Sequence, residues 1–431
     1  MSTLPATEPA RLVARTIAVP DETAAELLTL IPAQVPAEHV CSWVRRGEGL
    51  VGWGRALDFE TQGADRFAQA ARWWRALCTD AVIRDEVAAP GTGPIAFGSM
   101  AYAAHSPQRS RLVVPEVVVG RRAGRAWLTT ITAGGQLPPT PHDLNPAPEP
   151  PSPGVIAFAD GPKTAAEWAS AVGEAVERIT SGALDKVVLA RSLVARAEAP
   201  IDPRFLLRRL ADSYDNTWVF AVAGLIGATP EMLVRLDRGL ASSRVLAGTI
   251  RRTGDDAHDL ALSASLARSS KDLEEHEYAV RSVADALGRH CASMNVPESP
   301  FVLHLPNVMH LATDVAGAVE DGATSLELAA SLHPSAAVCG TPTATADALI
   351  TELEGFDRGR YAGPVGWMDA AGDGEWGIAL RSGQLDPADP CQISIFAGCG
   401  IVAGSDPEDE VAESDAKFLP MRDALTAAPT A

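Results

Sequence analysis

The sequence predicts a mixed α/β protein with mostly antiparallel pairing of its strands. In the C-terminal portion, stretches with helical apolar spacing alternate with hairpin-like pairs of strands. The 431 residues are 46% hydrophobic and 21% charged, an ordinary globular composition with enough length for one large domain or two smaller ones. No GxGxxG follows a first strand and no P-loop motif occurs, so nucleotide-binding folds lose support.

The N-terminal portion reads as mixed structure without chemistry of its own. Residues 64–78 have the spacing of a helix, with Trp73 and Trp74 as core anchors. Residues 110–133 read as two strands around a basic turn, and Pro115 favours an edge strand or a bulge. We interpret this portion as scaffold.

A proline-dense segment, residues 137–153, connects the two portions. Proline fixes φ and removes a backbone donor, so the segment is neither a helix nor a central strand. It divides the chain into an N-terminal part, 1–150, and a C-terminal part, 151–431, that carries the chemistry. Because one sheet can receive strands from both sides of such a loop, we expect one integrated domain.

The C-terminal portion contains the clearest elements. Helices are expected at 163–180, near 203–213 and along 256–292, and strands at 186–196, 216–227, 231–237 and 242–250. Residues 361–404 read as a meander, with a hairpin-turn signal in the Asp-Gly pair at 373–374. A last helix begins after residues 405–407, where Asp406 or Ser405 can cap it and Pro407 suits its first turn.

Charge and cysteine content limit the function classes. The formal net charge of −19 disfavours nucleic acid and anionic lipid as partners, and an anionic substrate would need a locally positive pocket or a metal ion. The six cysteines form no CxxC pair, which argues against a zinc site and fits a reduced, cytoplasmic protein. The sequence shows no signal peptide and no apolar run of the ~20 residues that span a bilayer.

Two helical stretches carry acidic residues that suit a metal site. Glu410, Glu413 and Lys417 are spaced to share one helical face, next to a glycine-rich turn that a ligand can approach. The stretch around His276 holds further acids, of which Glu275 can face inward. Two carboxylates from different helices would suit Mg²⁺. The alternative is that both faces are simply solvated.

Three charged residues stand in otherwise apolar strands: Lys186, Glu231 and Arg381. Each could be a strand-end charge that reaches solvent. In partly apolar surroundings, however, the pKa values of a lysine and a glutamate move toward neutrality, and the pair could then act as base and acid.

Taken together, these motifs resemble the chorismate-utilising enzymes, and specifically the isochorismate synthases. The pieces stand in the family's order over about the last 260 residues: KVVLAR (186–191), GATPEMLVR (227–235), LAGT (246–249), KDLEEHEYAV (271–280), HPSAAVCGTP (333–342), EGFDRGRYAGPVGW (354–367), GEWGIALR (374–381) and FAGCGIVAGSDPEDEVAESDAK (396–417). Any one of these motifs alone is weak evidence for the family, whereas eight motifs in the family's order are specific evidence for it. The resemblance implies the fold of that family, an α/β (α+β) fold of large, mostly antiparallel sheets packed with helices on their outside.

The resemblance also implies roles for individual residues. Lys186 would be the base that activates water, and Glu231 the acid that protonates the departing ring hydroxyl. Glu275 and Glu413 would hold Mg²⁺, with support from Glu410. The residues implied in substrate binding are Gly248, Thr249, His310, Ala337, Tyr361, Arg381, Gly398, Gly400 and Lys417. Mg²⁺, Arg381 and Lys417 would supply the positive charge that two substrate carboxylates need.

Within the family, three positions separate the activities. Anthranilate synthases look different at Lys186, where they carry glutamine, and aminodeoxychorismate synthases carry a nucleophilic lysine at the position of Ala247. Salicylate synthases, which also eliminate pyruvate, typically carry threonine at the position of Ala337, so isochorismate synthase is favoured and salicylate synthase is the alternative. A chorismate-binding protein without catalysis is disfavoured because Lys186 and Glu231 are both present.

The same resemblance implies a monomer that needs no glutamine amidotransferase subunit. The downstream pathway stays open, because isochorismate can feed the synthesis of siderophores, menaquinone or salicylate.

Overall fold

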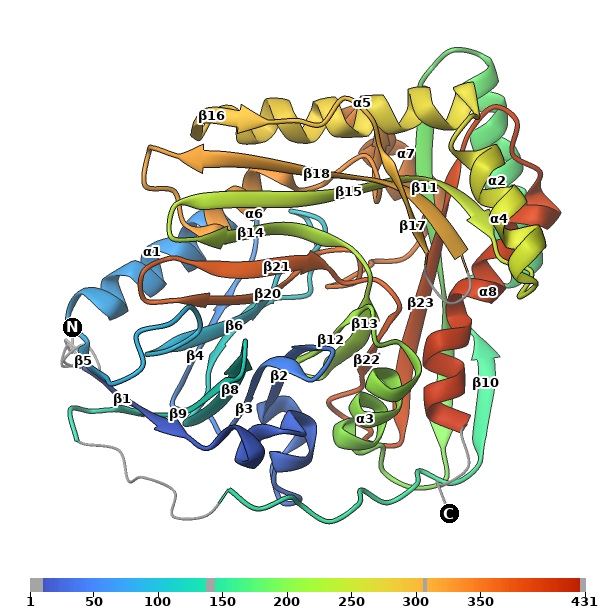
Figure 1. Cartoon of the computed structure of the whole chain (residues 1–431). Helices are drawn as coiled ribbons and strands as arrows, with labels where there is room; N and C mark the ends of the chain where they lie inside the picture. Colours follow the sequence, from blue (N-terminus) through green and yellow to red (C-terminus); the bar gives the residue numbers. More distant parts are fainter. Residues whose placement is uncertain (1–10, 137–143, 305–307, 427–431) are drawn as a thin grey trace, which may run out of the picture.

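The structure, a computed structural model, describes residues 11–136, 144–304 and 308–426, except for the side chains of Thr249, Lys271 and Glu275. Two large sheets form its framework (Figure 1). Among the described strands, every pairing is antiparallel except that of β1 with β5, which is parallel. The predicted class of large, mostly antiparallel sheets with helices on their outside is confirmed.

The first sheet has 13 strands in the order β10-β11-β23-β22-β13-β12-β2-β3-β8-β9-β1-β5, with β19 paired to β11. Its strands are β1 (Leu12–Val19), β2 (Val40–Arg45), β3 (Glu48–Trp53), β5 (Val82–Asp85), β8 (Val117–Arg122), β9 (Arg125–Ala133), β10 (Ile156–Asp160), β11 (Lys186–Ala197), β12 (Trp218–Val222), β13 (Leu225–Thr229), β19 (Gly340–Thr341), β22 (Ser382–Leu385) and β23 (Gln392–Ile401).

The second sheet has 10 strands in the order β16-β18-β15-β14-β21-β20-β6-β7-β4, with β17 paired to β18. Its strands are β4 (Leu57–Thr61), β6 (Ile95–Ser99), β7 (Ser110–Val114), β14 (Met232–Asp237), β15 (Leu240–Arg251), β16 (Cys291–Asn295), β17 (Phe301–His304), β18 (Val308–Val319), β20 (Pro364–Asp369) and β21 (Gly374–Ile378).

Both sheets join strands from the two sides of the proline-dense segment. In the first sheet β12 pairs with β2, and in the second β20 pairs with β6. Of the segment itself, residues 137–143 lie outside the described residues, and residues 144–153 form no helix or strand. The part of the chain before the segment therefore contributes strands to the same two sheets that carry the C-terminal strands.

The helices lie on the outside of the sheets. They are α1 (Arg66–Thr79), α2 (Ala165–Thr180), α3 (Pro203–Ser213), α4 (Asp256–Leu266), α5 (Ser270–Leu287), α6 (Ser325–Leu332), α7 (Thr343–Glu354) and α8 (Pro407–Thr426), with short 3-10 helices η1 (Asp21–Ala24), η2 (Leu27–Leu30) and η3 (Ala37–His39). In Figure 1, α5 runs along β15 and β18, while α8 lies beside β23. No helix among the described residues is long and apolar enough to cross a membrane.

Helix ends follow the capping chemistry of the sequence. Asp406 caps α8, because its carboxylate accepts hydrogen bonds from the backbone N–H groups of Glu408 and Asp409 at 2.9 and 3.2 Å. Thr164 and Glu167 form a capping box at the start of α2. Of the two expected anchors of α1, Trp74 is buried, whereas Trp73 is half-buried and stacks on Phe59 with ring centroids 4.9 Å apart.

Three predictions on local structure need correction. The helical stretch 256–292 is two helices, α4 and α5, followed by strand β16. The turn between β20 and β21 spans 370–373, and its left-handed residue is Gly372 with φ of 89°. The Asp-Gly pair at 373–374 therefore lies at the end of the turn and not at its centre. The meander is interrupted, because β21 belongs to the second sheet and β22 to the first.

The same change of sheet occurs at Pro115 and between β13 and β14. Residues 112–120 were expected as one strand with an edge or a bulge at Pro115, but they are divided between β7 in the second sheet and β8 in the first. Proline lacks the N–H that a continuous ladder would need, so the chain leaves one sheet at this residue and enters the other.

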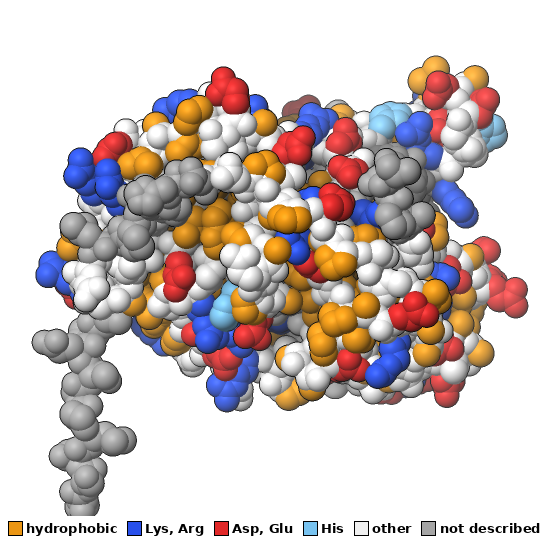
Figure 2. Space-filling view, turned by 90° about the horizontal axis from the view of Figure 1, so that it is seen from below, with side chains coloured by type: hydrophobic (Ala, Val, Ile, Leu, Met, Phe, Trp, Pro, Cys, Tyr) orange, Lys and Arg blue, Asp and Glu red, His pale blue; other side chains and the backbone are white. Residues whose placement is uncertain are grey.

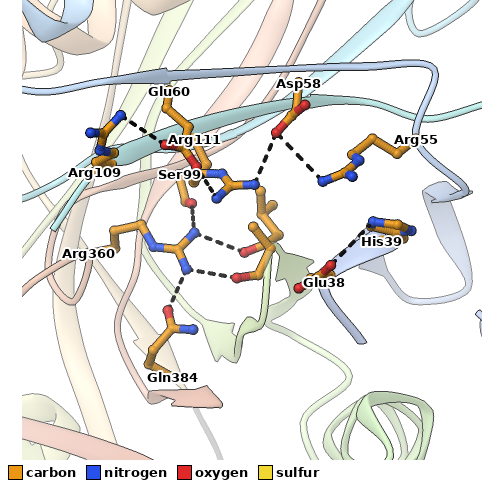
Figure 3. Close-up of polar contacts among 12 residues, drawn as sticks. Glu38, His39, Arg55, Asp58, Glu60, Ser99, Arg109, Arg111, Arg360 and Gln384 are labelled. Atoms are coloured by element: carbon orange, nitrogen blue, oxygen red, sulfur yellow. Dashed lines mark hydrogen bonds and ion pairs between the residues drawn. The ribbon is translucent and has the colours of Figure 1, made fainter. Parts of the chain in front are cut away.

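The buried guanidinium group of Arg360 forms hydrogen bonds with both sheets (Figure 3). Arg360 donates to Ser99 Oγ on β6 and to Gln384 Oε1 on β22. It also donates to the backbone oxygens of Val222, the last residue of β12, and of Ala223. Burial, with Arg111 nearby, lowers the pKa of Arg360 to about 9. The neighbouring residue Tyr361 is thereby held between the two sheets.

On the face seen in Figure 2, acidic and basic side chains are interspersed and form no continuous basic stripe.

Candidate active site

The chain passes from one sheet to the other between β13 and β14 and again between β21 and β22. These two crossings bring Glu231 and Arg381 close together. Glu231 lies between β13 and β14, and Arg381 between β21 and β22. The crossings are joined through the backbone, since Ile378 N–H donates to Glu231 O at 3.1 Å and Ala228 N–H donates to Arg381 O at 3.2 Å. Arg381 has φ of 47°, a left-handed conformation that is costly for a residue with a Cβ and typical of functional sites.

These crossings border a cavity of about 390 Å³. Twelve residues that the sequence singled out line it: Lys186, Glu231, Gly248, His310, Ala337, Tyr361, Arg381, Gly398, Gly400, Glu410, Glu413 and Lys417. The side chains of Thr249 and Glu275 lie outside the described part of the chain. The cavity has the size of a small-molecule site and combines apolar surface with convergent charged groups.

Paired strands β11 and β23 form one wall of this cavity. Lys186, Val188 and Ala190 alternate along β11, and Gly400 and Gly398 stand opposite the last two. A Cβ on Gly400 would lie 2.9 Å from Lys186 Cε, and one on Gly398 would lie 3.3 Å from the Tyr361 hydroxyl. The glycines therefore leave room for the Lys186 and Tyr361 side chains.

We expect Gly400→Ala to displace the Lys186 amine and to lower kcat at least ~10-fold, because catalytic groups must hold their geometry closely. Gly400 does not have a left-handed φ, so alanine fits its backbone. Gly173→Ala, in α2 and outside the cavity, is the matched control, since a Cβ there would come no nearer than 3.9 Å to Pro407. Steady-state kinetics and thermal unfolding would test both variants, and equal kcat values for the two would contradict this role of Gly400.

The carboxyl group of Glu231 is poised to carry a proton. Burial raises its pKa from 4.5 to about 7, even though Lys186 and Arg381 act in the opposite direction. A carboxyl group with a pKa near neutrality can hold a proton at physiological pH and release it to a departing group.

Helix α8 presents Glu410, Glu413 and Lys417 to the cavity, together with Asp409. Lys417 Nζ lies 2.6 Å from Glu413 Oε1 and donates to Gly398 O at 2.9 Å. Burial opposes the charge on Lys417, but Cys399 and Glu413 outweigh it and raise the pKa of the lysine. Burial also opposes ionisation of Glu413, but the charges of Lys417 and Arg381 outweigh it and lower the pKa of the carboxyl group. Lys417 is therefore a fixed cation beside an ionised carboxylate.

The donor set on α8 fits a hard divalent cation. Carboxylate oxygens of Glu410 and Glu413 lie with Cys399 Sγ inside 4.8 Å of one another. Glu410 Oε1 accepts a hydrogen bond from Ser405 Oγ at 2.7 Å, whereas Oε2 is buried and accepts none from the described residues. Burial raises the pKa of Glu410, so a cation at Oε2 would stabilise its ionised form. Oxygen donors of this kind suit Mg²⁺, while the Cys399 thiol does not.

His310 faces the cavity as a neutral imidazole. Burial, with the charges of Arg381 and Lys417, lowers its pKa to about 3. Tyr361 stays a phenol, because burial raises its pKa well above the usual range. Both can take part in hydrogen bonds without adding charge.

A buried ion pair lies under the cavity floor and was missed by the sequence interpretation. Arg358 and Glu354 pair at 2.5 Å, and both side chains are at most 3% exposed. Glu354 also accepts from Ala190 N–H, while Arg358 donates to Val188 O and Val338 O. Because Val188, Ala190 and Val338 line the cavity, this pair fixes β11 against the segment that follows α6.

Other lining residues were also missed, namely Asp272, Ser405, Asp406 and Asp409. Asp272 stands one helical turn before Glu275, so helical spacing alone could have identified it. Its side chain packs over Gly248, where the strand β15 bulges with φ of 74°.

Two other cavities of the described structure measure about 370 and 790 Å³, and neither is lined by the proposed site residues. The first is lined by Arg45, Arg122, Arg235 and Arg244, with several acids and two tryptophans, and the second by residues of α1 and α6. Neither contains Lys186 or Glu231.

Comparison with known proteins decides the family. Residues 6–426 match the family described as "Chorismate binding enzyme". The chain belongs to the chorismate-binding enzyme family. This confirms the resemblance seen in the C-terminal motifs and extends it to the N-terminal portion, which the motifs alone matched only loosely.

Relatives of this family share much of their length with the chain. The isochorismate synthase DhbC of Bacillus subtilis is 37% identical over 344 residues, covering 77% of this chain and 81% of the relative. The salicylate biosynthesis isochorismate synthase of Pseudomonas aeruginosa is 33% identical over 411 residues, covering 89% and 84%. The crystal structure of DhbC from Bacillus anthracis superposes with a TM-score of 0.75 at 31% identity, covering 94% of this chain and all of that one.

Proposed function

We propose that this protein is an isochorismate synthase, an isomerase that converts chorismate to isochorismate with the help of Mg²⁺. The observation that carries the proposal is the presence of Lys186 and of Glu231, whose pKa is raised to about 7, in one cavity of a chorismate-binding enzyme. Relatives that cover most of the chain are named isochorismate synthases.

The reaction needs a base and an acid at different ring carbons. Lys186, as the free amine, accepts a proton from a water molecule whose oxygen bonds to the ring. The ring double bonds shift, and the bond from another ring carbon to its hydroxyl breaks. Glu231 gives its proton to that hydroxyl, which leaves as water. One water is consumed and one is released, so the product is an isomer of the substrate.

Substrate binding requires local positive charge, because the net charge of the whole chain is −19. Arg381 and Lys417 supply it in the cavity, and Tyr361 and His310 offer neutral hydrogen-bonding groups. Glu410 and Glu413 would hold Mg²⁺, together with Glu275 from α5. When bound there, the ion would supply further positive charge opposite a substrate carboxylate.

We expect Glu413→Ala to raise the Mg²⁺ concentration for half-maximal activity at least ~10-fold, because the ion loses an ionised ligand. Glu413→Gln, which keeps the size of the side chain, should behave alike. Glu408→Ala, on the exposed side of the same helix, is the control. Activity measured over a Mg²⁺ titration would decide, and identical titration curves for Glu413→Ala and Glu408→Ala would contradict a metal role for Glu413.

Chromatography of the products formed from chorismate and Mg²⁺ tests the function itself. Isochorismate as the main product supports the proposal, whereas salicylate with pyruvate would indicate a salicylate synthase. Ala337 lines the cavity and favours the first outcome by the family pattern. No turnover, with or without EDTA, would indicate a binding protein. We further propose a cytoplasmic monomer that acts without an amidotransferase subunit.

A further inference from the structure

A second, much smaller cavity lies behind Glu231. It measures about 30 Å³ and is lined by Glu231, Leu233, Ser243, Arg244, Val245, Leu246, Ala279, Ser282, Val283, Ser335, Ala336 and Ala337. Glu231, Leu246 and Ala337 also line the large cavity, so the two spaces adjoin at the proposed acid. A space of this size holds one or two water molecules, since one water needs roughly 10–15 Å³.

The small cavity offers the polar partners that a buried water needs. Ser335 Oγ is buried and has no hydrogen-bond partner among the described residues. Ser243 Oγ donates to Leu233 O at 2.6 Å and keeps its lone pairs for a further donor. With the Glu231 carboxyl group these hydroxyls provide three partners, and a buried water typically makes about three hydrogen bonds.

Two residues that line the small cavity, Arg244 and Ser282, also contact solvent. Ser282 on α5 is exposed, and Arg244 is 25% exposed and pairs with Asp314, which is 50% exposed. A proton can therefore pass between solvent and Glu231 without crossing the large cavity.

We propose that water in this small cavity, held by Ser335 and Ser243, returns a proton to Glu231 while substrate or product fills the large cavity. This inference rests on the proposed function. After Glu231 has given its proton to the leaving hydroxyl, it is a carboxylate. The cavity water donates a proton to it and takes one from solvent on the Ser282 side. Lys186 releases the proton it accepted, so each turnover leaves the count of protons unchanged.

This return route determines behaviour at high substrate concentration. When the large cavity is empty, Glu231 can also regain its proton from water on that side. At saturating concentration, chorismate occupies the large cavity and excludes this water. Only the route through the small cavity then remains. In an enzyme without that route, the next chorismate would bind before Glu231 has regained its proton. The ionised Glu231 could not protonate the leaving group.

Filling the small cavity tests the proposal. Ser335→Val places methyl groups where the water would sit, and Ala279→Val does so from α5, which keeps the test informative should one variant fold poorly. We expect unchanged kcat/KM but a rate that falls about 10-fold at saturating chorismate, as substrate inhibition, because loss of proton transfer costs factors of this order or more. Ser170→Val, an exposed serine on α2, should keep the hyperbolic curve of the unmodified enzyme.

Crystal structures of the unmodified protein and Ser335→Val provide a second readout. Water in the small cavity of the former and none in the latter is expected. Hyperbolic kinetics with normal kcat in both filled variants would overturn the proposal, as would a parallel fall of kcat and kcat/KM, which indicates general distortion. Absence of isochorismate from the unmodified enzyme would instead reject the proposed function.

Discussion

Glu231→Gln is expected to lower kcat by ~100- to 10,000-fold, the usual contribution of a general acid. The amide keeps the size of the side chain, but its N–H groups are far too weakly acidic to give a proton to the leaving hydroxyl. Chorismate should still bind, because Arg381 and Lys417 are unchanged, so its binding measured by calorimetry should stay close to normal. Turnover at more than a tenth of the normal rate would remove Glu231 from the acid role.

The pH dependence gives an independent check on the same residue. Glu231 is active only when protonated, and its pKa in the free enzyme is about 7. Because Lys186 must be unprotonated in the same reaction, the plot of log kcat/KM against pH should change slope near pH 7, where Glu231 titrates, rather than depend on one group alone. The absence of a change of slope between pH 6 and pH 8 would assign the acid to another group.

Stability should respond to pH through Glu231 as well. Its folded pKa of about 7 lies above the ordinary value of 4.5, so the unfolded chain loses this proton first as pH rises. The stabilisation from the protonated group is complete below pH 4.5 and is lost by about pH 7, and the difference is worth about 3 kcal/mol in the free energy of unfolding. Glu231→Gln should lack this loss, which thermal unfolding at pH 4.5 and pH 8 would measure against the unmodified protein.

The sequence predicted the fold class and many elements because apolar spacing and capping residues are local signals. Asp406 at the start of α8 and the strand from Lys186 are examples. The change of sheet at Glu231 and Arg381 could not be read in this way, since a strand that leaves one sheet and enters another keeps the same composition. The pairing partners that distinguish the two cases lie far away in the sequence.

The candidate site was predicted from motifs rather than from geometry. Spacing placed Glu410, Glu413 and Lys417 on one helical face, and the structure brings that face to the cavity. Spacing could not show that Arg358 and Glu354 form a buried pair beside the cavity. An i, i+4 pair of opposite charges at the end of a helix is usually interpreted as a pair on the surface. Spacing also could not reveal the small cavity, which depends on how α5 packs against the segment around Ser335.

Lys186→Ala is expected to lower turnover severely by removing the group that takes a proton from water. The loss should be ~100- to 10,000-fold in kcat, comparable to that of Glu231→Gln, since both proton transfers are needed in one reaction. Lys163→Ala, at a lysine outside the cavity, is the control and should behave normally. A normal rate in Lys186→Ala would contradict the assignment of the base.

Loss of activity alone does not separate a base from a group that merely positions substrate, but chemical rescue does. Truncation to alanine leaves space beside Gly400, over which the Lys186 side chain lies, with Cε 2.9 Å from the position of a Cβ there. A small primary amine such as methylamine can enter this space and accept the proton in place of Lys186. The rate should then rise in proportion to the concentration of free amine and not of its ammonium form. Rescue by tetramethylammonium, which has charge but no basic nitrogen, would show instead that Lys186 acts through its charge.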